Sequence, residues 1–209
     1  MTKTNQQKVK DFLINNGVII VMFILVIYTG FTSDNFFTKN NFMNILMNMS
    51  SRLVIALGIA GCVITAGCDL SAGRMIGFGA CISGMLLQRM DYSGKFFPDM
   101  QPLNVFVVAL IAMLVCAAFG TVTGFFIAYL NVPPFIATLA MMEIVYGIGL
   151  IVTNATPLGG YVEQYTNVSN GKFLGINYLI WIAIIVAAIT WFIFNMTRHG
   201  KYMYAIGGN

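Results

Sequence analysis

Six apolar runs, separated by short polar segments, limit what this sequence can fold into. A helix that crosses a bilayer needs about 20 mostly apolar residues, and runs of this kind recur along the whole chain. Charged residues make up only 9% of the sequence, whereas a soluble domain carries about 25%. We therefore expect an all-α, polytopic membrane protein with about six transmembrane helices. The expected spans cover residues 17–31, 44–66, 75–88, 103–130, 134–152 and 178–195.

The number of spans and the basic residues predict how the chain is oriented. The first run follows a basic tail but lacks a small-residue cleavage pattern, so we expect an uncleaved span. Six spans put both chain ends on one side, and the excess of basic residues favours the cytoplasm for that side. The expected parts are a cytoplasmic tail (1–16), a transmembrane domain (17–195) and a cytoplasmic segment (196–209). The cytoplasmic side carries Lys3, Lys8, Lys10, Arg74, Arg198 and Lys201, and the outer side carries Lys39, Arg52, Arg89, Lys95 and Lys172.

The expected topology makes the loops unequal in length. On the cytoplasmic side the connections are tight turns, at 67–74 and 131–133. On the outer side the loops are longer, at 32–43, 89–102 and 153–177. These outer loops are polar enough to dock a soluble partner, and they are equally consistent with simple connections.

The sequence contains no motif for enzyme chemistry. It has no GxxxxGK[ST] phosphate-binding loop, no HExxH and no GxSxG. We therefore expect that the chain is not an enzyme, binds no cofactor and cannot hydrolyse ATP by itself. The four cysteines form no CxxC pair, and there is only one histidine, so we interpret them as packing residues and expect no metal site. The cysteines are Cys62, Cys68, Cys81 and Cys116.

A polar break between two apolar runs, at residues 66–74, is the most informative local feature. Asp69 or Ser71 could cap the next helix, and Arg74 is close enough in sequence to pair with Asp69. One interpretation is a capped turn with an ion pair. The other is a broken helix whose polar end lines a substrate cavity, which fits the short third run.

An acidic residue lies about ten residues into the fifth run. A charge at this depth is unfavourable unless it is paired or faces water, so Glu143 marks either a solute path or a packing contact with a partner such as Arg74.

Small residues recur at four-residue spacing in the third and fourth runs. This spacing lets helix backbones approach closely in lipid, so we expect packing, with a smooth wall along a solute path as the alternative. The pairs are Gly120 and Gly124, Gly73 and Gly77, and Ala80 and Gly84.

Three segments together resemble the membrane permease subunits of bacterial ABC sugar importers. They are ALGIAGCVITAGCDLSAGRMIGFGA (56–80), AYLNVPPFIATLAMM (128–142) and TRHGKYMYAIGGN (197–209). Relatives for ribose and similar sugars usually read DLSVGS in the first motif, and the DLSAGR of this chain is typical of the galactoside branch. The resemblance covers nearly the whole chain.

The resemblance implies a function and a set of partners. The chain would form the translocation path for galactose or methyl galactosides in the bacterial inner membrane. A separate ATPase subunit would supply ATP hydrolysis, a periplasmic or lipid-anchored sugar-binding protein would deliver substrate, and a second permease copy would complete a homodimer. The residues themselves give the candidate substrate path as Asp69, Ser71, Arg74 and Glu143, and the resemblance implies that coupling to the ATPase falls at Gly207, Gly208 and Asn209.

Two features depart from the family pattern. The family is apolar where this chain has Glu143, and its members continue well past Asn209 through a coupling loop and further spans. We therefore expect a C-terminally truncated permease that would not transport alone. Two other functions remain: a secondary transporter or channel, which should show inverted repeats and more intramembrane charge, and an intramembrane enzyme, which needs a second polar cluster near Asp69 or Glu143.

Overall fold

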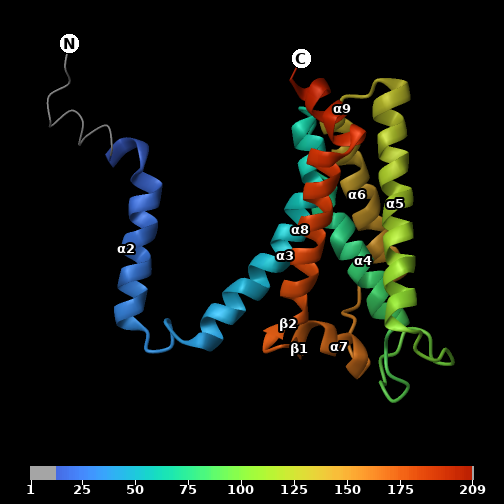
Figure 1. The fold of residues 1–209 in the computed structure, drawn as a ribbon. Coiled ribbons are helices and arrows are strands. Elements are labelled where there is room, and N and C mark those ends of the chain that lie inside the picture. Colours follow the sequence, from blue (N-terminus) through green and yellow to red (C-terminus); the bar gives the residue numbers. More distant parts are fainter. Residues whose placement is uncertain (1–12, 209) are drawn as a thin grey trace, which may run out of the picture. The chain divides into compact units, whose positions relative to one another are not determined.

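The computed structural model describes residues 13–208 and shows helices joined by short loops (Figure 1). A helix occupies each of the six ranges expected to span the membrane. The basic tail with Lys3, Lys8 and Lys10 lies outside the described residues, as does Asn209. The helices are α2 (Gly17–Thr32), α3 (Lys39–Ile64), α4 (Ala72–Leu86), α5 (Val105–Leu130), α6 (Pro134–Val152), α7 (Glu163–Asn170), α8 (Tyr178–Met196) and α9 (Arg198–Gly207), and the strands β1 (Lys172–Phe173) and β2 (Ile176–Asn177) form a small antiparallel hairpin.

Four of these helices, α3, α5, α6 and α8, are long and apolar enough to cross a membrane. The helices α2 and α4 are apolar but shorter, with 16 and 15 residues. At about 1.5 Å per residue, α4 measures about 22 Å, whereas the hydrocarbon core of a bilayer is about 30 Å thick. Residues 65–71, which precede α4, are not helical. The third apolar run therefore forms a short helix that follows an irregular segment.

The chain divides into two compact units, Met1–Asn48 and Met49–Asn209. In the described part of the first unit, α2 has no buried residue and is apolar around its whole circumference. It ends where the Ser33 amide donates to the Thr29 carbonyl at 3.0 Å. The Asn41 side-chain amide donates to the Phe36 carbonyl at 2.8 Å and thereby holds the turn before α3.

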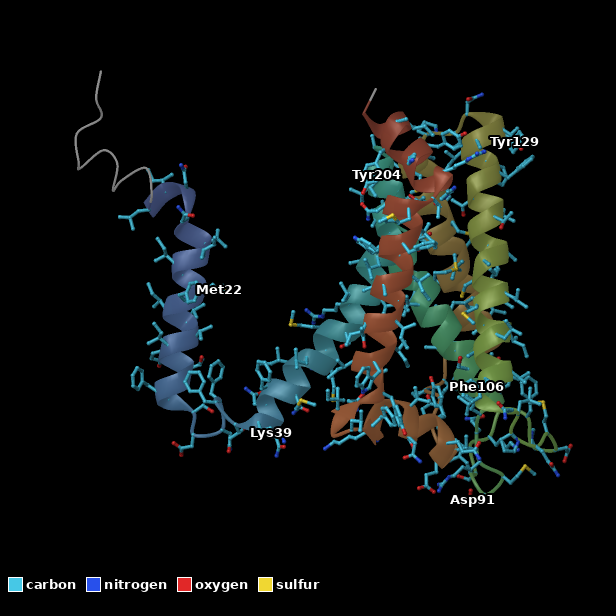
Figure 2. The ribbon with its side chains drawn as sticks, viewed as in Figure 1. Met22, Lys39, Asp91, Phe106, Tyr129 and Tyr204 are labelled. Atoms are coloured by element: carbon cyan, nitrogen blue, oxygen red, sulfur yellow. The ribbon has the colours of Figure 1, made fainter. Side chains whose placement is uncertain are left out.

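The core of the second unit lies where α4, α5 and α6 pack together (Figure 1). Phe78 and Ile82 of α4 contact Met141 and Val145 of α6, and the Phe78 ring meets Phe119 of α5 edge to face at 5.5 Å. Many other large apolar side chains point outward, as Phe106 and Tyr129 do on α5 (Figure 2). A surface of this kind is stable only against lipid or another apolar partner.

Asparagine and proline set the ends of the long helices. The Asn104 side chain accepts a hydrogen bond from the Phe106 amide at the start of α5, and Asn177 does the same for Leu179 at the start of α8. Helix α5 ends at Asn131, which adopts the left-handed conformation with φ of 53°. Pro134 then occupies the first position of α6, where its missing N–H would have had no helical partner.

A fully buried glutamine joins two loops at one end of the second unit. The Gln88 side-chain amide donates to the Gly159 carbonyl at 3.0 Å, and its oxygen accepts from the Phe96 amide at 2.7 Å. Backbone bonds from Arg89 to Gly160 and from Val162 to Leu87 strengthen the junction. Residues 87–103 and 153–162 therefore form one rigid block.

We expect Gln88→Ala to destabilise this block by about 1–3 kcal/mol, because two half-buried backbone groups lose their hydrogen-bond partner. The measurement is limited proteolysis of the 89–102 loop in detergent-solubilised protein, together with the thermal unfolding midpoint. Gln101→Ala is the matched control, because Gln101 lies exposed in the same loop. Equal cleavage rates for the two variants would show that Gln88 does not hold the loops together.

Candidate functional site

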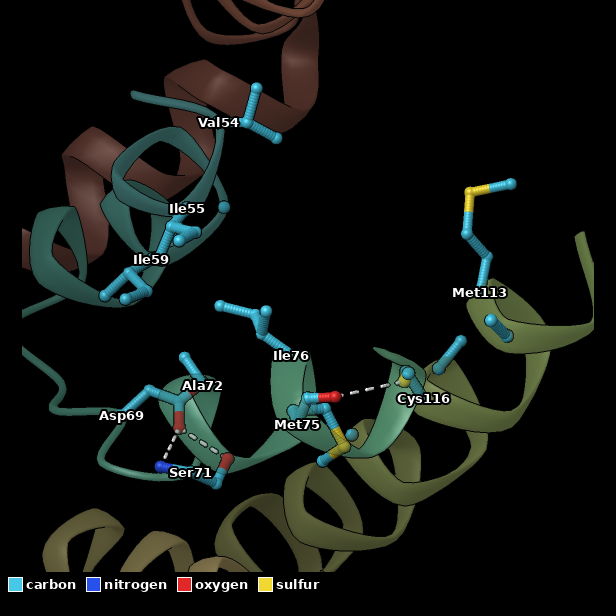
Figure 3. Close-up of a pocket in the computed structure, with 15 residues that line it drawn as sticks. Val54, Ile55, Ile59, Asp69, Ser71, Ala72, Met75, Ile76, Met113 and Cys116 are labelled. Atoms are coloured by element: carbon cyan, nitrogen blue, oxygen red, sulfur yellow. Dashed lines mark hydrogen bonds between the residues drawn. The ribbon is translucent and has the colours of Figure 1, made fainter. Parts of the chain in front are cut away.

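A cavity of about 820 Å³ lies between α3, α4 and α5 in the second unit (Figure 3). Its walls are mostly aliphatic and small: Ile55 and Ile59 lie on α3, Ile76 on α4 and Met113 on α5. Polar groups come from the segment before α4 and from Cys116 on α5. An apolar cavity with a few placed polar groups is typical of a small-molecule site.

Asp69 and Ser71 supply the polar end of this cavity. The Asp69 Oδ1 atom accepts two hydrogen bonds from Ser71, one from its backbone amide at 2.8 Å and one from its hydroxyl at 2.7 Å (Figure 3). Ser71 is buried and already has helical backbone angles, and its carbonyl accepts from the Met75 amide. The carboxylate therefore fixes the point at which α4 begins.

Two parts of the capped-turn interpretation, a cap by Ser71 and an Asp69–Arg74 ion pair, are wrong, whereas Asp69 does accept the Ser71 amide at the start of α4. The Ser71 side chain accepts no capping bond from α4, since Ser71 itself has helical rather than extended backbone angles, and its hydroxyl donates to Asp69. Arg74 does not pair with Asp69, since the one ion pair between residues of the described range 13–208 joins Arg89 to Asp91 at 3.5 Å. The Arg74 guanidinium lies 4.0 Å from the centre of the Tyr146 ring of α6.

Arg74 and Glu143 lie away from the main cavity. Arg74 lines a separate groove of about 200 Å³ between α4 and α6. Glu143 is exposed on α6, whose buried face consists of Thr138, Met141, Val145 and Gly149. Of the four candidate path residues, the structure thus brings only Asp69 and Ser71 together.

The small-residue pairs behave differently from one another. A methyl group added at Gly120 or Gly124 would meet nothing within 4 Å, so these residues do not pack against another helix within residues 13–208. Gly120 instead lies on the cavity wall, as in the smooth-wall alternative. Gly73 and Gly77 are also open, whereas Gly84 is close to Leu158 and Tyr161.

Two further side chains contact the region around the cavity's polar end, Thr138 at the segment before α4 and Cys116 at the first turn of α4, and the sequence analysis did not single them out for this role. The Thr138 hydroxyl of α6 lies 3.4 Å from the Cys68 carbonyl, and the Cys116 thiol lies 3.6 Å from the Met75 carbonyl. Both are small polar groups in long apolar helices. Their spacing from Asp69 in the sequence gives no sign that they meet this segment.

The end of the described chain contacts the helix that forms one cavity wall. A methyl group at Gly207 of α9 would overlap the Ile64 carbonyl oxygen at the end of α3, and one at Gly61 would press on Met203 at 2.8 Å. The Gly208 amide donates to the Tyr204 carbonyl at 3.0 Å and closes α9. The candidate coupling residues Gly207 and Gly208 therefore end a helix that rests on α3.

The chain is similar in sequence to curated sugar-import permeases. The chain is 38% identical over 216 residues to the galactose/methyl galactoside import permease of Escherichia coli strain K12, covering 100% of this chain and 64% of that protein. It is 39% identical to the protein of that name from Haemophilus influenzae, with the same coverage. It is 31% identical to the ribose import permease of Escherichia coli strain K12, covering 96% of this chain and 60% of the relative.

These relatives confirm the resemblance to sugar-importer permeases, and the chain spans about two thirds of their length. No solved structure gave a significant match. A family model described as the permease component of the branched-chain amino acid transport system matches residues 41–209. The all-α, polytopic membrane class expected from the sequence is confirmed by the helical structure and this match. The chain belongs to this permease family.

Proposed function

We propose that this chain is the membrane-spanning subunit of an ATP-driven importer of galactose or methyl galactosides. The observation that carries the proposal is the cavity of about 820 Å³ with Asp69 and Ser71 at one end, in a chain similar to galactose/methyl galactoside import permeases. Sugars are small and polar, so a path for them needs few but well-placed hydrogen-bonding groups.

The irregular segment before α4 supports the role of this cavity as the translocation path. Non-helical backbone at membrane depth is tolerated where it is buried in protein or lines a water-filled cavity. Residues 65–71 are non-helical, and Asp69 and Ser71 of this segment line the cavity. We assign the substrate path to these two residues and the surrounding walls of α3, α4 and α5.

Three partners follow from the proposal. A separate ATPase subunit supplies the energy, because the chain has no phosphate-binding loop. A periplasmic or lipid-anchored sugar-binding protein docks on the rigid block that Gln88 holds together. A second copy of the permease completes a homodimer in the bacterial inner membrane.

Both chain ends face the cytoplasm in the proposed orientation. In the second unit, α9 and the turn between α5 and α6 lie at one end, and the long loops with α7 lie at the other (Figure 1). The end with α9 carries Arg198 and Lys201, whereas the opposite end carries Arg89, Lys95 and Lys172 together with the acidic residues Asp91, Asp99 and Glu163. The proposed orientation therefore rests on the three lysines of the N-terminal tail and on six basic residues against five over the whole chain.

We expect deletion of the gene that encodes this chain to reduce ATP-dependent uptake of radiolabelled methyl galactoside to background, and a plasmid copy of the complete reading frame to restore it. The physical reason is that the sugar has no path through the hydrocarbon core without the permease. Unchanged uptake would contradict the proposal. Uptake that survives ATP depletion and follows an ion gradient would favour a secondary transporter.

We expect Asp69→Ala and Asp69→Asn both to lower uptake by roughly tenfold, the factor that corresponds to loss of a charged hydrogen bond. Alanine removes both bonds to Ser71, whereas asparagine keeps an acceptor oxygen but loses the charge. The measurement is initial uptake rate at matched membrane levels of each variant. If Asp69→Asn transports like the wild type, the carboxylate only shapes the turn and does not act in the path.

We expect Gly207→Ala to lower both uptake and co-purification of the ATPase by roughly tenfold. The added methyl group overlaps the Ile64 carbonyl, and overpacking of this kind costs about 1–3 kcal/mol, so α9 must shift from α3. Gly147→Ala is the control, because a methyl group there meets nothing within 4 Å. Normal ATPase binding by Gly207→Ala would show that the contact of α9 with α3 is not needed for coupling to the ATPase.

A further inference from the structure

Two charged side chains on the core helices lack an ion-pair partner. Arg74 of α4 and Glu143 of α6 are both exposed, and neither has an opposite charge within 4.0 Å among residues 13–208. In lipid, an exposed charge of this kind is unfavourable unless another group satisfies it. Both residues are therefore available to pair with a charged group outside the described chain.

Arg74 and Glu143 lie on the same outward side of the α4–α6 pair. The Arg74 guanidinium rests on the Tyr146 ring, and Tyr146 is 41% exposed. Glu143 lies three residues before Tyr146 on α6, which is a little less than one helical turn and about 4.5 Å along the axis. Met141 and Val145, which are buried, mark the opposite side of α6. The arginine and the glutamate are thus close in depth.

No other charged residue on the apolar helices is as well placed to pair with Arg74 or Glu143. Within α2, α4, α5, α6 and α8, Arg74 and Glu143 are the only charged residues. Helix α3 adds Lys39 at its first residue and Arg52. Glu143 is therefore the single acid of these helices, and Arg74 is the base that shares its face.

We propose that a second copy of this chain docks on the α4–α6 face, with Arg74 of each copy paired to Glu143 of the other. Two copies inserted in the same direction are related by a two-fold axis along the membrane normal. This symmetry preserves depth, so Arg74 and Glu143, which lie at similar depth on one copy, can each meet the other across the axis. It also forms the ion pair twice, which satisfies all four charges.

The groove beside Arg74 allows the close approach that such a contact needs. Gly73 and Gly77 line it, and a methyl group at either position would meet nothing within 4 Å. Glycines at this spacing permit backbones to approach in lipid. The inference rests on the second copy in the proposed function and adds the face and the residues that join the copies.

The test uses two copies of the chain with different tags, co-expressed in one membrane and extracted in mild detergent. The readout is the fraction of the second tag that is retained when the first is captured. We expect wild-type copies to co-purify. Arg74→Glu alone and Glu143→Arg alone should each lower recovery by roughly tenfold, because like charges then face each other twice.

Mixing the two single variants distinguishes pairing between copies from pairing within a copy. When Arg74→Glu is co-expressed with Glu143→Arg, both contacts across the axis again join opposite charges, so recovery should return to the wild-type value. The arrangement within each single chain stays repulsive. Arg52→Glu is the matched control on another helix, and it should leave recovery unchanged.

Each contrary result overturns a defined part of the inference. No co-purification of wild-type copies would remove the second copy from the proposed function as well. If wild-type copies pair and neither single variant weakens the pairing, a homodimer forms but not through the α4–α6 face. Rescue by Arg74→Glu/Glu143→Arg in one chain, without rescue by the mixture, would place the pair within a chain. Loss without any rescue would assign the charges to lipid headgroups or to another segment.

Discussion

The position of α4 depends on the two hydrogen bonds that Asp69 accepts from Ser71. They set the point where irregular backbone becomes helix, and every later residue of α4 takes its rotation from that point. A shift of one residue would turn the helix by about 100° and exchange its faces. The cavity, the packed core and the outer groove all depend on that rotation.

Each face of α4 then serves a different environment. Met75 and Ile76 line the cavity, Phe78 and Ile82 pack against α6, and Arg74 lies over Tyr146. These faces follow from the helical period, but a short helix can present them only if its neighbours are longer. The helices α5 and α6 fill that role and hold α4 between them.

Several of the polar contacts that shape this structure lie where the chain leaves its helices. Gln88 joins two loops at one end, Asp69 holds the break before α4, and Asn104 and Asn177 begin α5 and α8. Away from these points the large apolar side chains mostly face outward. This distribution fits a protein whose backbone must be satisfied internally and whose surface meets lipid. It also explains why two exposed charges, Arg74 and Glu143, stand out.

The sequence by itself determined the helices and the membrane class, because apolar runs of sufficient length leave a chain few other solutions. It also located the polar break at Asp69 and Ser71, since glycine and short polar residues between apolar runs mark a turn. Only the tertiary structure decided which groups meet. Sequence neighbours suggested an Asp69–Arg74 ion pair, but helical rotation carries Arg74 to Tyr146. Gln88 binds a carbonyl 71 residues away, and Gly207 rests on Ile64. Such contacts depend on how helices pack, which a one-dimensional pattern does not contain.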